Sequence, residues 1–351
     1  MKLVRLEELT GDEILARSIV TGDYTELLSE GTKIKLEYIP KLLDIGIREV
    51  LIQDNKIKAQ DMVILKEEIT DKCREQVRTI ISRHTYNSND ENMAQICNTA
   101  DSIISNILDE EDVVEKIFDI KERSADIYEH SINTCSLAML VSLKMRLKKS
   151  LVHDIGVGCL LHDLGLRYIT VNFENTDQSM LSAKEKEEYK KHPIYGYSAL
   201  KSENWLSKES KDIILCHHEN IDGSGFPLHI KDMSKAVRIV AVCDYFDELI
   251  CGIGHERMKV HEAVEFLKSN KGIIFDSNVV DELLDFTAVY PSRSTVVTSD
   301  GSHAIVIKQN KGFPERPILQ LISDKDGKAY EEDIVIDLLE CKNVFIEKVL
   351  N

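Results

Sequence analysis

The sequence predicts a mainly α protein: an all-α helical domain, preceded by a small α+β module and followed by a short β meander. Three observations predict this fold class. Apolar residues recur at helical spacing from about residue 110 to 285. Short β-like runs separated by turns fill the first 60 residues, and apolar and polar residues alternate around Asp-Gly turns near the end of the chain. With 43% apolar residues among 351, the chain can build two or more domains.

The N-terminal part divides into a module at 1–60 and a helical segment at 61–109. Val50, Leu51 and Ile52 form a strand-like run after the turn at Gly46. By its position, we expect the module to be regulatory or dimerising. The next segment is charged and helical in pattern, broken by the turn-rich loop HTYNSNDEN at 84–92, which predicts two amphipathic helices. They form either a packing layer or a dimerising pair that would make the protein a homodimer, since the heptads are too irregular for a coiled coil.

The remaining chain divides into the helical domain at 110–290 and a β-rich extension at 291–351. The extension contains STVVTSDGSHAIVIKQN and RPILQLISDKDGKAY, in which alternating residues surround the turns at Asp300-Gly301 and Asp326-Gly327. Asp-Gly between alternating segments is a strong hairpin signal. These two segments therefore predict the meander.

Composition limits the partners and the compartment. The chain has 44 basic and 61 acidic residues, a formal charge of −17, which argues against a nucleic-acid polymer as the main partner. A small phosphate ligand remains compatible if a metal supplies positive charge. None of the eight cysteines forms a CxxC pair, and no signal peptide or apolar run of membrane-spanning length is present. We expect a soluble, cytoplasmic protein without a membrane span.

Histidine and aspartate residues gather in five short segments of the helical region. The segment CHHENIDGSGFP, residues 216–227, has two adjacent histidines, and four other segments add further candidate metal ligands. The candidates are Asp126 and His130 in ADIYEHS, His162 and Asp163 in LLHDLG, His192 in KKHPIYG, His217 and His218, and Asp244 in VAVCDYFDE. Asp126 and His130 are four residues apart, so on a helix they would share a face about 6 Å apart and could hold one ion.

The adjacent histidines suggest a cluster of ions, because two neighbouring rings cannot easily serve one ion from the same direction. A second His-Asp pair, His153-Asp154, lies nine residues before His162 and on the opposite helix face, so His153 is assigned to the surface or to helix capping. Asp247 shares a face with Asp244 and is expected to hydrogen-bond a ligand.

The donor types restrict the metal. Imidazoles and carboxylates without thiolates suit Fe, Mn, Zn or Ni. Cys216 adjoins the histidines, but its side chain is expected to point into the core.

The order of these motifs resembles the HD-GYP family, bacterial metal-dependent phosphodiesterases of the HD superfamily that hydrolyse cyclic di-GMP. The HD pair corresponds to His162-Asp163, and HHENIDGSGFP is similar to the family's HHE-x-x-DGSGYP, with GFP at 225–227. RIVAVCDYFDEL is similar to its second aspartate motif. The resemblance covers about residues 110–290 and implies a helical HD-type domain.

Carried over to this chain, the resemblance implies a catalytic pair, a metal shell and a substrate shell. His162 and Asp163 would be catalytic, with Asp163 bridging two ions, Fe or Mn. The implied metal ligands are His130, His162, Asp163, His192, His217, His218 and Asp244; a third ion at Asp126 is left open, because some members have the longer glutamate there. Two such ions share a water, whose hydroxide attacks the phosphorus, giving pGpG or GMP. The substrate-binding candidates are Asp222, Gly223, Gly225, Phe226, Arg167 and Arg257.

Three departures from the family pattern lie in the substrate shell. Leu166 replaces the lysine of HD-x-GK, with Arg167 next to it, and Phe226 replaces the tyrosine of GYP. The run CGIGHERMK keeps only Arg257 and Lys259 where the family has an Arg-x-Tyr-Lys-like run. The leading hypothesis is therefore a cyclic di-GMP phosphodiesterase. Its alternatives are a cyclic-dinucleotide-binding module with little catalysis and a phosphohydrolase of another nucleotide.

Overall fold

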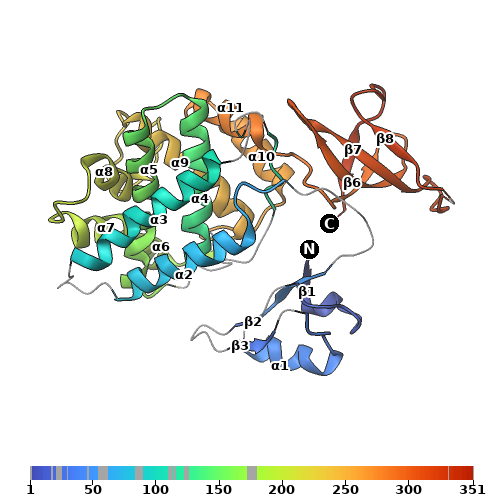
Figure 1. Cartoon of the computed structure of the whole chain (residues 1–351), viewed down its shortest axis with the longest axis horizontal. Coiled ribbons are helices and arrows are strands. Elements are labelled where there is room, and N and C mark those ends of the chain that lie inside the picture. The colour runs from blue at the N-terminus through green and yellow to red at the C-terminus, as the bar shows by residue number, and fades with distance from the viewer. Residues whose placement is uncertain are drawn as a thin grey trace.

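The computed structural model describes residues 2–16, 19–20, 26–29, 31–45, 47–53, 62–83, 90–109, 113, 116–121, 126–171, 180–330 and 332–350. These residues build a helical body, an N-terminal module and a C-terminal β domain (Figure 1). Each part has its own cluster of buried apolar side chains. The mainly α fold predicted from the sequence is confirmed. Within the described ranges, no helix combines the length and apolarity needed to cross a membrane.

The N-terminal module is built from short elements around a small core. They are β1 (Lys2–Arg5), η1 (Leu6–Glu8), β2 (Ile19–Val20), β3 (Glu26–Leu28), η2 (Leu36–Tyr38), α1 (Ile39–Asp44) and β4 (Glu49–Ile52). β1 pairs antiparallel with β4, which lies at the strand predicted from REVLIQD, and β2 pairs with β3. Leu6, Leu15 and Ile34 are fully buried between these elements.

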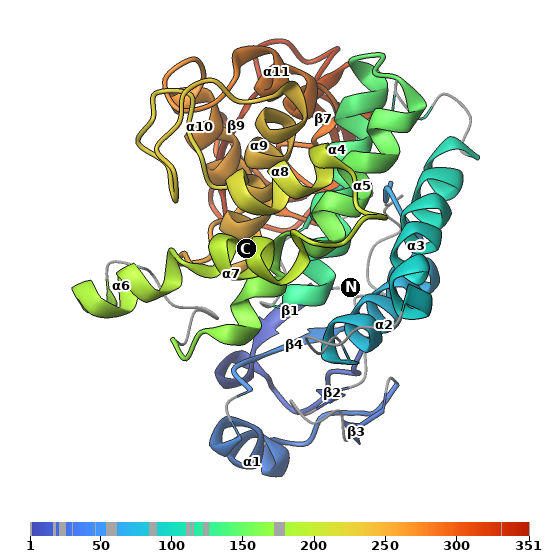
Figure 2. The same cartoon turned by 90° about the vertical axis from the view of Figure 1, so that its left-hand side faces the viewer.

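The two helices predicted before the helical domain are α2 (Glu67–Arg83) and α3 (Asp90–Leu108). α2 packs on α4 and α3 packs on α5 (Figure 2). Val77 of α2 and Ile96 and Ile103 of α3 are fully buried and belong to the core of the helical body. In this structure both helices pack on the helical body, and a dimerising role for the same helices stays a prediction.

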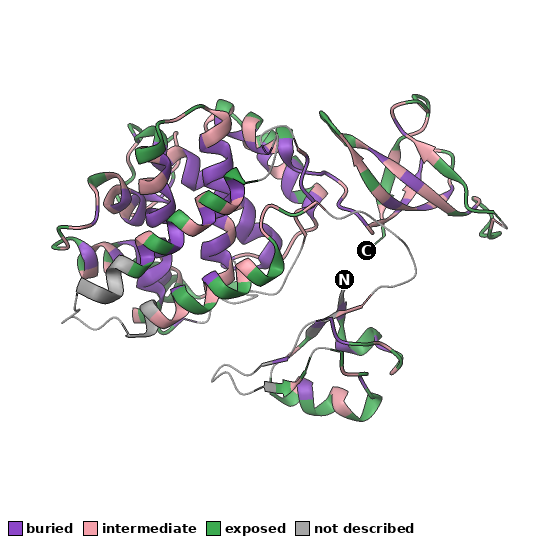
Figure 3. Ribbon diagram, in the orientation of Figure 1, coloured by how far each residue is buried: buried purple, intermediate pink, exposed green. Residues whose placement is uncertain are grey.

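The helical body surrounds two buried helices. Its elements are α4 (Ile127–Lys144), α5 (Lys149–Leu161), η4 (His162–Tyr168), α6 (Ala183–Tyr189), α7 (His192–Leu200), α8 (Lys208–Cys216), α9 (Lys235–Cys251), α10 (Val260–Asn270) and α11 (Ser277–Phe286). Most residues of α4 and α9 are buried (Figure 3). α9 starts after Ser234, whose hydroxyl accepts from the amide of Val237, and ends at Gly252, whose φ of +81° suits glycine.

The C-terminal part forms one five-stranded antiparallel sheet. Its strands are β5 (Thr295–Thr298), β6 (His303–Asn310), β7 (Phe313–Ser323), β8 (Val335–Asp337) and β9 (Ile346–Val349), in the order β8-β7-β6-β5-β9. The first four strands are the predicted meander, and the turn at Asp300-Gly301 has the positive φ of +87° at glycine. The return of β9 to pair with β5 was not predicted, because its pairing partner lies about 50 residues away.

Asp119 joins the helical body to the β domain. Its buried carboxylate accepts hydrogen bonds from the amides of Met62 and Ser292 at 2.9 and 2.7 Å, from the Ser292 hydroxyl at 2.9 Å and from Nε2 of Gln309 at 2.9 Å. The neighbouring Phe118 exchanges backbone hydrogen bonds with Phe286 and Ala288. One carboxylate therefore connects three distant segments of the chain.

Replacing Asp119 by Ala should lower the free energy of unfolding by about 2–4 kcal/mol, because several buried donors lose their acceptor together. Chemical denaturation followed by circular dichroism measures this loss. Asp333 is exposed and accepts a hydrogen bond from Nε2 of Gln320, so Asp333→Ala is a matched control that should change stability by less than about 0.5 kcal/mol. Equal stability of the two variants would contradict the assignment.

Candidate metal centre

The predicted metal ligands come together at the ends of several helices. His162 and Asp163 follow the last residue of α5, His192 opens α7, and His217 and His218 follow the last residue of α8. His130 lies in the first turn of α4, and Asp244 lies in the middle of α9. All are buried except His218, which is partly exposed.

The cluster contains two groups of facing atoms with Asp163 between them. In one group, Nε2 of His130 and Nε2 of His162 both lie 3.0 Å from Oδ1 of Asp244 and 3.2 Å from each other. In the other, Nε2 of His192 lies 3.1 Å from Nε2 of His217 and 3.2 Å from Nε2 of His218.

The two oxygens of Asp163 face different groups. Oδ2 lies 3.3 Å from Nε2 of His162, whereas Oδ1 lies 3.4 Å from Nε2 of His192. This placement is the one that a bridging carboxylate requires, and it agrees with the role that the resemblance implies for Asp163.

Hydrogen bonds at the far side of each ring orient the imidazoles. Nδ1 donates to the carbonyl of Cys159 at 2.6 Å in His162, and to the carbonyl of Tyr189 at 2.8 Å in His192. In His217, Nδ1 lies 3.1 Å from the carbonyl of Ile214. A ring that donates through Nδ1 directs Nε2 into the cluster, and in its neutral form it offers the lone pair of Nε2 there.

His130 is oriented by a side chain instead. Its Nδ1 donates to Oδ2 of Asp247 at 2.7 Å. The expectation that Asp247 hydrogen-bonds a ligand is thereby confirmed. Carboxylate partners of this kind fix the ring of a metal-binding histidine and increase its basicity.

Burial and neighbouring charges divide the imidazoles into two classes. Burial, together with the charge of His162, holds the pKa of His217 at about 3, and the pKa values of His192 and His218 are also lowered, mainly by burial. For His162, burial lowers the pKa, but Asp163 and Asp244 outweigh it and raise the pKa to about 10. The pKa of His130 is raised in the same way by Asp244 and Asp247.

These donors fit divalent cations. Lone pairs that face one another at 3.0–3.2 Å repel unless a proton or a cation lies between them, and Oδ2 of Asp244 is buried without a hydrogen-bond partner among the described residues. Among the described residues, four groups each have candidate ligand atoms within 4.8 Å of one another: His130, His162 and Asp244; Asp163, His192, His217 and His218; His218, Asp244 and Glu248; and His130, Asp247 and Cys251. Nitrogen and oxygen donors of this kind suit Fe, Mn, Zn or Ni.

Asp126 has a different role from the one considered for it. It is the N-cap of α4, with Oδ1 accepting from the amides of Tyr128 and Glu129 at 3.0 and 2.9 Å. Its Oδ2 accepts from Nε of Arg74 at 3.0 Å. Both oxygens are engaged, and Asp126 belongs to none of the groups of candidate ligands above. In this structure the carboxylate caps the helix and contacts Arg74, and a third ion held by Asp126 stays a prediction.

The side chains of His153 and Cys216 lie away from the metal ligands, as predicted from the sequence. His153 lies on α5 away from the cluster, with Nε2 3.5 Å from Asp101, and is partly exposed. The side chain of Cys216 is buried in the apolar core, where burial raises its pKa to about 12.

The segment after the two histidines forms a tight loop. Asp222 is exposed, and its Oδ1 accepts from the amide and hydroxyl of Ser224 at 2.9 and 2.7 Å. Gly223 has a φ of +81°, and a Cβ on Gly225 would lie 2.4 Å from the carbonyl oxygen of His218. The structure thus gives these three residues a role in shaping the loop, and their contact with substrate stays a prediction.

Two acidic residues near the cluster were missed by the sequence reasoning. Glu219 is buried and accepts from the amides of Leu228 and His229, which holds the loop against the histidines. Glu248 is 2% exposed, and its pKa is raised to about 7 by burial and by Asp244. Glu219 directly follows His218, and Glu248 is one helical turn after Asp244; both signals were present in the sequence.

The departures from the family pattern also have structural counterparts. The ring of Phe226 stacks on the ring of His218, with centroids 4.6 Å apart. Leu166 is buried, whereas Arg167 is exposed with its guanidinium 5.5 Å from the ring centroid of Tyr168. The predicted substrate contacts through Arg167 stay untested.

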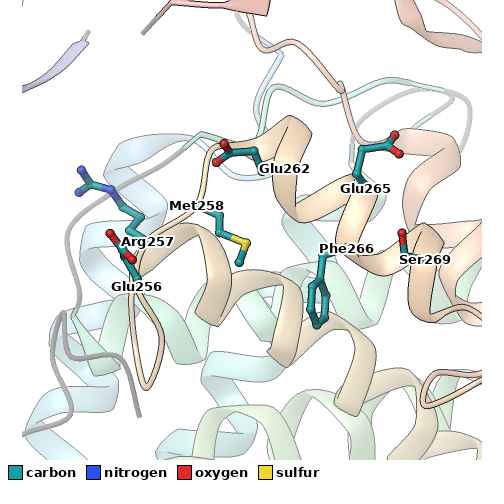
Figure 4. A pocket seen from close by; sticks show the side chains of 7 residues that line it. All are labelled: Glu256, Arg257, Met258, Glu262, Glu265, Phe266 and Ser269. Atoms are coloured by element: carbon teal, nitrogen blue, oxygen red, sulfur yellow. The ribbon is translucent and has the colours of Figure 1, made fainter. Parts of the chain in front are cut away.

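Arg257 lies in an open pocket of about 610 Å³ beside α10 (Figure 4). The pocket is lined by Glu256, Arg257, Met258, Glu262, Glu265, Phe266 and Ser269. It contains none of the candidate metal ligands, and three glutamates make its wall acidic. Such a wall does not favour a phosphate, so a substrate contact through Arg257 remains a prediction.

Comparison with known families identifies both C-terminal parts of the chain. Residues 112–279 match the HD domain, and residues 295–351 match a KOW domain associated with the HD domain. A solved HDG"Y"P protein from Bdellovibrio bacteriovorus shares the fold, with a TM-score of 0.50 and 19% identity over 80% of this chain and 97% of that one.

Curated relatives extend the comparison. The chain is 25% identical over 258 residues to a cyclic di-GMP phosphodiesterase of Pseudomonas aeruginosa, covering 71% of this chain and 62% of the relative. It is 26% identical over 243 residues to cyclic di-GMP phosphodiesterase PdeB of Borreliella burgdorferi, covering 67% of this chain and 63% of the relative. The chain thus spans less than two thirds of either relative. Together these matches confirm the resemblance drawn from the motifs.

Replacing Gly165 by Ala should lower the number of metal ions bound. A Cβ on Gly165 would lie 1.8 Å from the carbonyl oxygen of His192, so the backbone that carries His192 must shift. Elemental analysis of the metal-loaded protein measures the loss. The matched control is Gly156→Ala, whose Cβ would lie 1.8 Å from the terminal methyl of Met139, a flexible end that can move. Unchanged metal content in both variants would contradict the prediction.

Metal binding at pH 7 should release protons. Without a bound cation, His162 has a pKa raised to about 10 and is protonated at pH 7, and the cation displaces this proton. The apparent affinity should therefore increase as the pH rises towards 10. Calorimetric titration with Mn²⁺ in buffers of different ionisation enthalpy measures the release, and a heat independent of the buffer would refute it.

Proposed function

We propose that this HD-GYP-type HD-domain protein is a metal-dependent phosphodiesterase that hydrolyses a cyclic dinucleotide, with cyclic di-GMP as the preferred substrate. The observation that carries the proposal is the placement of Asp163 between two groups of inward-facing imidazoles. A carboxylate shared by two groups of ligands is what a centre with two adjacent cations needs.

At such a centre, some residues of the chain would bind the ions and others would orient the ligands. His130, His162 and Asp244 would hold one ion, and His192 and His217 would hold the other, with Asp163 between them. Paired cations of this kind activate a water molecule and neutralise charge that develops on a phosphoryl group. The helix-end carbonyls and Asp247 keep the rings in position, so little reorganisation is needed when a substrate arrives. We propose Fe or Mn as the metal, as the family resemblance implies, and the nitrogen and oxygen ligands are compatible with either.

The substrate would enter beside His218, the partly exposed member of the cluster. Phe226 stacks on this ring, and Nζ of Lys190 lies 5.8 Å from the centroid of Phe226. Lys190 thus supplies a positive charge on the same side, where the lysine of the family pattern is replaced by Leu166. The printed names of the curated relatives, cyclic di-GMP phosphodiesterases, support the choice of substrate.

A second candidate is a cyclic-dinucleotide receptor that turns its ligand over slowly. Leu166 is buried and Arg167 is exposed, so this short helix places an apolar side chain where the family has a phosphate-contacting lysine. A lost charge-assisted contact is worth about 1.5–3 kcal/mol, which weakens binding of the phosphate without changing the metal ligands.

The phosphodiesterase activity is tested by loading the purified chain with Fe²⁺ or Mn²⁺ under reducing conditions and following linear pGpG by chromatography. Asp163→Asn and His162→Ala should each lower kcat by at least about 100-fold, because the first removes the negative charge of the proposed bridging carboxylate and the second removes an imidazole ligand. His153→Ala, on α5 just before these residues, is the control and should keep full activity. Removal of the metal by a chelator should abolish turnover.

The outcomes separate the candidates. Cyclic di-AMP, a hybrid cyclic dinucleotide and pGpG are assayed in parallel, and faster turnover of one of them would change the substrate. Tight calorimetric binding of cyclic di-GMP without any product after hours would favour the receptor. Neither binding nor turnover with any loaded metal would refute both.

A further inference from the structure

Glu248 is a buried carboxylate that the proposed two-ion centre does not use. It lies one helical turn after Asp244 on α9 and is 2% exposed. Asp247, its neighbour in sequence, faces His130 instead. The side chains of Asp247 and Glu248 therefore face different histidines of the cluster.

Glu248 shares a group of potential ligand atoms with Asp244 and His218. One atom from each of the three lies within 4.8 Å of the others. Oδ1 of Asp244 faces His130 and His162, whereas its Oδ2 is buried, has no hydrogen-bond partner within the described ranges, and lies 3.8 Å from Nδ1 of His218. A buried carboxylate oxygen without a donor is rare and requires a partner.

Two protein groups contact the Glu248 carboxylate at long distances. The Tyr189 hydroxyl lies 3.4 Å from Oε1, and Nε2 of His255 lies 3.6 Å from Oε2. Both distances are at or beyond the limit for a good hydrogen bond. Burying a carboxylate costs free energy unless it is well paired or binds a metal.

His218 can bind a cation in this group or a cation in the neighbouring group, but not both at once. A neutral imidazole has one ring nitrogen with a free lone pair. Nε2 of His218 faces His192, and Nδ1 faces Oδ2 of Asp244. If Nδ1 is the ligand atom, Asp163, His192 and His217 still remain for the adjacent ion. The two adjacent histidines then serve different ions.

We propose that Glu248, Asp244 and His218 hold a further divalent cation beside the two-ion centre. The site rests on the proposed function, because Asp244 is shared with that centre. Two carboxylates and one imidazole suit a cation such as Mn²⁺ or Fe²⁺. This cation would compensate two buried acidic groups that lie beside each other on α9.

The test compares metal content and does not depend on activity. The full chain, Glu248→Gln and Tyr189→Phe are loaded with Mn²⁺ under reducing conditions, freed of excess metal and analysed by elemental analysis and calorimetric titration. We expect one fewer Mn²⁺ per chain in Glu248→Gln than in the unsubstituted protein. Tyr189→Phe removes the hydroxyl beside Oε1 but keeps the carboxylate, and it should bind as many ions as the unsubstituted protein.

The outcomes also separate this site from the two-ion centre. Equal metal content in Glu248→Gln and the unsubstituted protein would overturn the further site and leave the centre intact. Loss of metal in Tyr189→Phe equal to that in Glu248→Gln would show a packing role and would also overturn the site. A chain that binds no Mn²⁺ would refute both proposals. If Glu248→Gln does not fold, anomalous diffraction from the unsubstituted protein decides: a Mn²⁺ peak in contact with Glu248 supports the site, and its absence refutes it.

Discussion

The structure of the helical body depends on one electrostatic constraint, the clustering of five imidazoles, four of them buried, and two buried aspartates whose free atoms face one another. Ring nitrogens 3.1–3.2 Å apart repel unless a cation or a proton separates them. An apolar core alone would never favour such an arrangement. The surrounding helices hold these groups together at a cost in stability, which a bound cation offsets.

The same kind of local hydrogen bond orients three of the histidines. His162, His192 and His217 each follow the end of a helix, and each ring donates to a carbonyl three residues earlier, at Cys159, Tyr189 and Ile214. The last carbonyls of a helix have no partner within the helix, so an imidazole placed just beyond the end satisfies one of them and directs its other nitrogen outward. His130 lies at the start of a helix, where no such carbonyl is free, and it uses Asp247 instead.

Much of this arrangement could be predicted from the sequence, because the helix ends, the order of the ligands and the Asp-Gly turns are local signals. The His162-Asp163 pair and the role of Asp247 follow from spacing along single helices. The engagement of Asp126 by Arg74 could not be predicted, since these residues are 52 positions apart and meet only through the packing of α2 on α4. The pairing of β9 with β5 is non-local for the same reason, and Glu248 acquires its setting only when α9 meets the loop that carries His218.

The ion pair between Arg74 and Asp126 has a mechanical consequence. Arg74 lies on α2, which follows the N-terminal module, and Asp126 caps the helix whose first turn carries His130. A shift of α2 must either break the contact between Arg74 and Asp126 or displace Asp126 together with the start of α4. The contact between Arg74 and Asp126 therefore links the position of α2 to the first turn of α4, which carries His130.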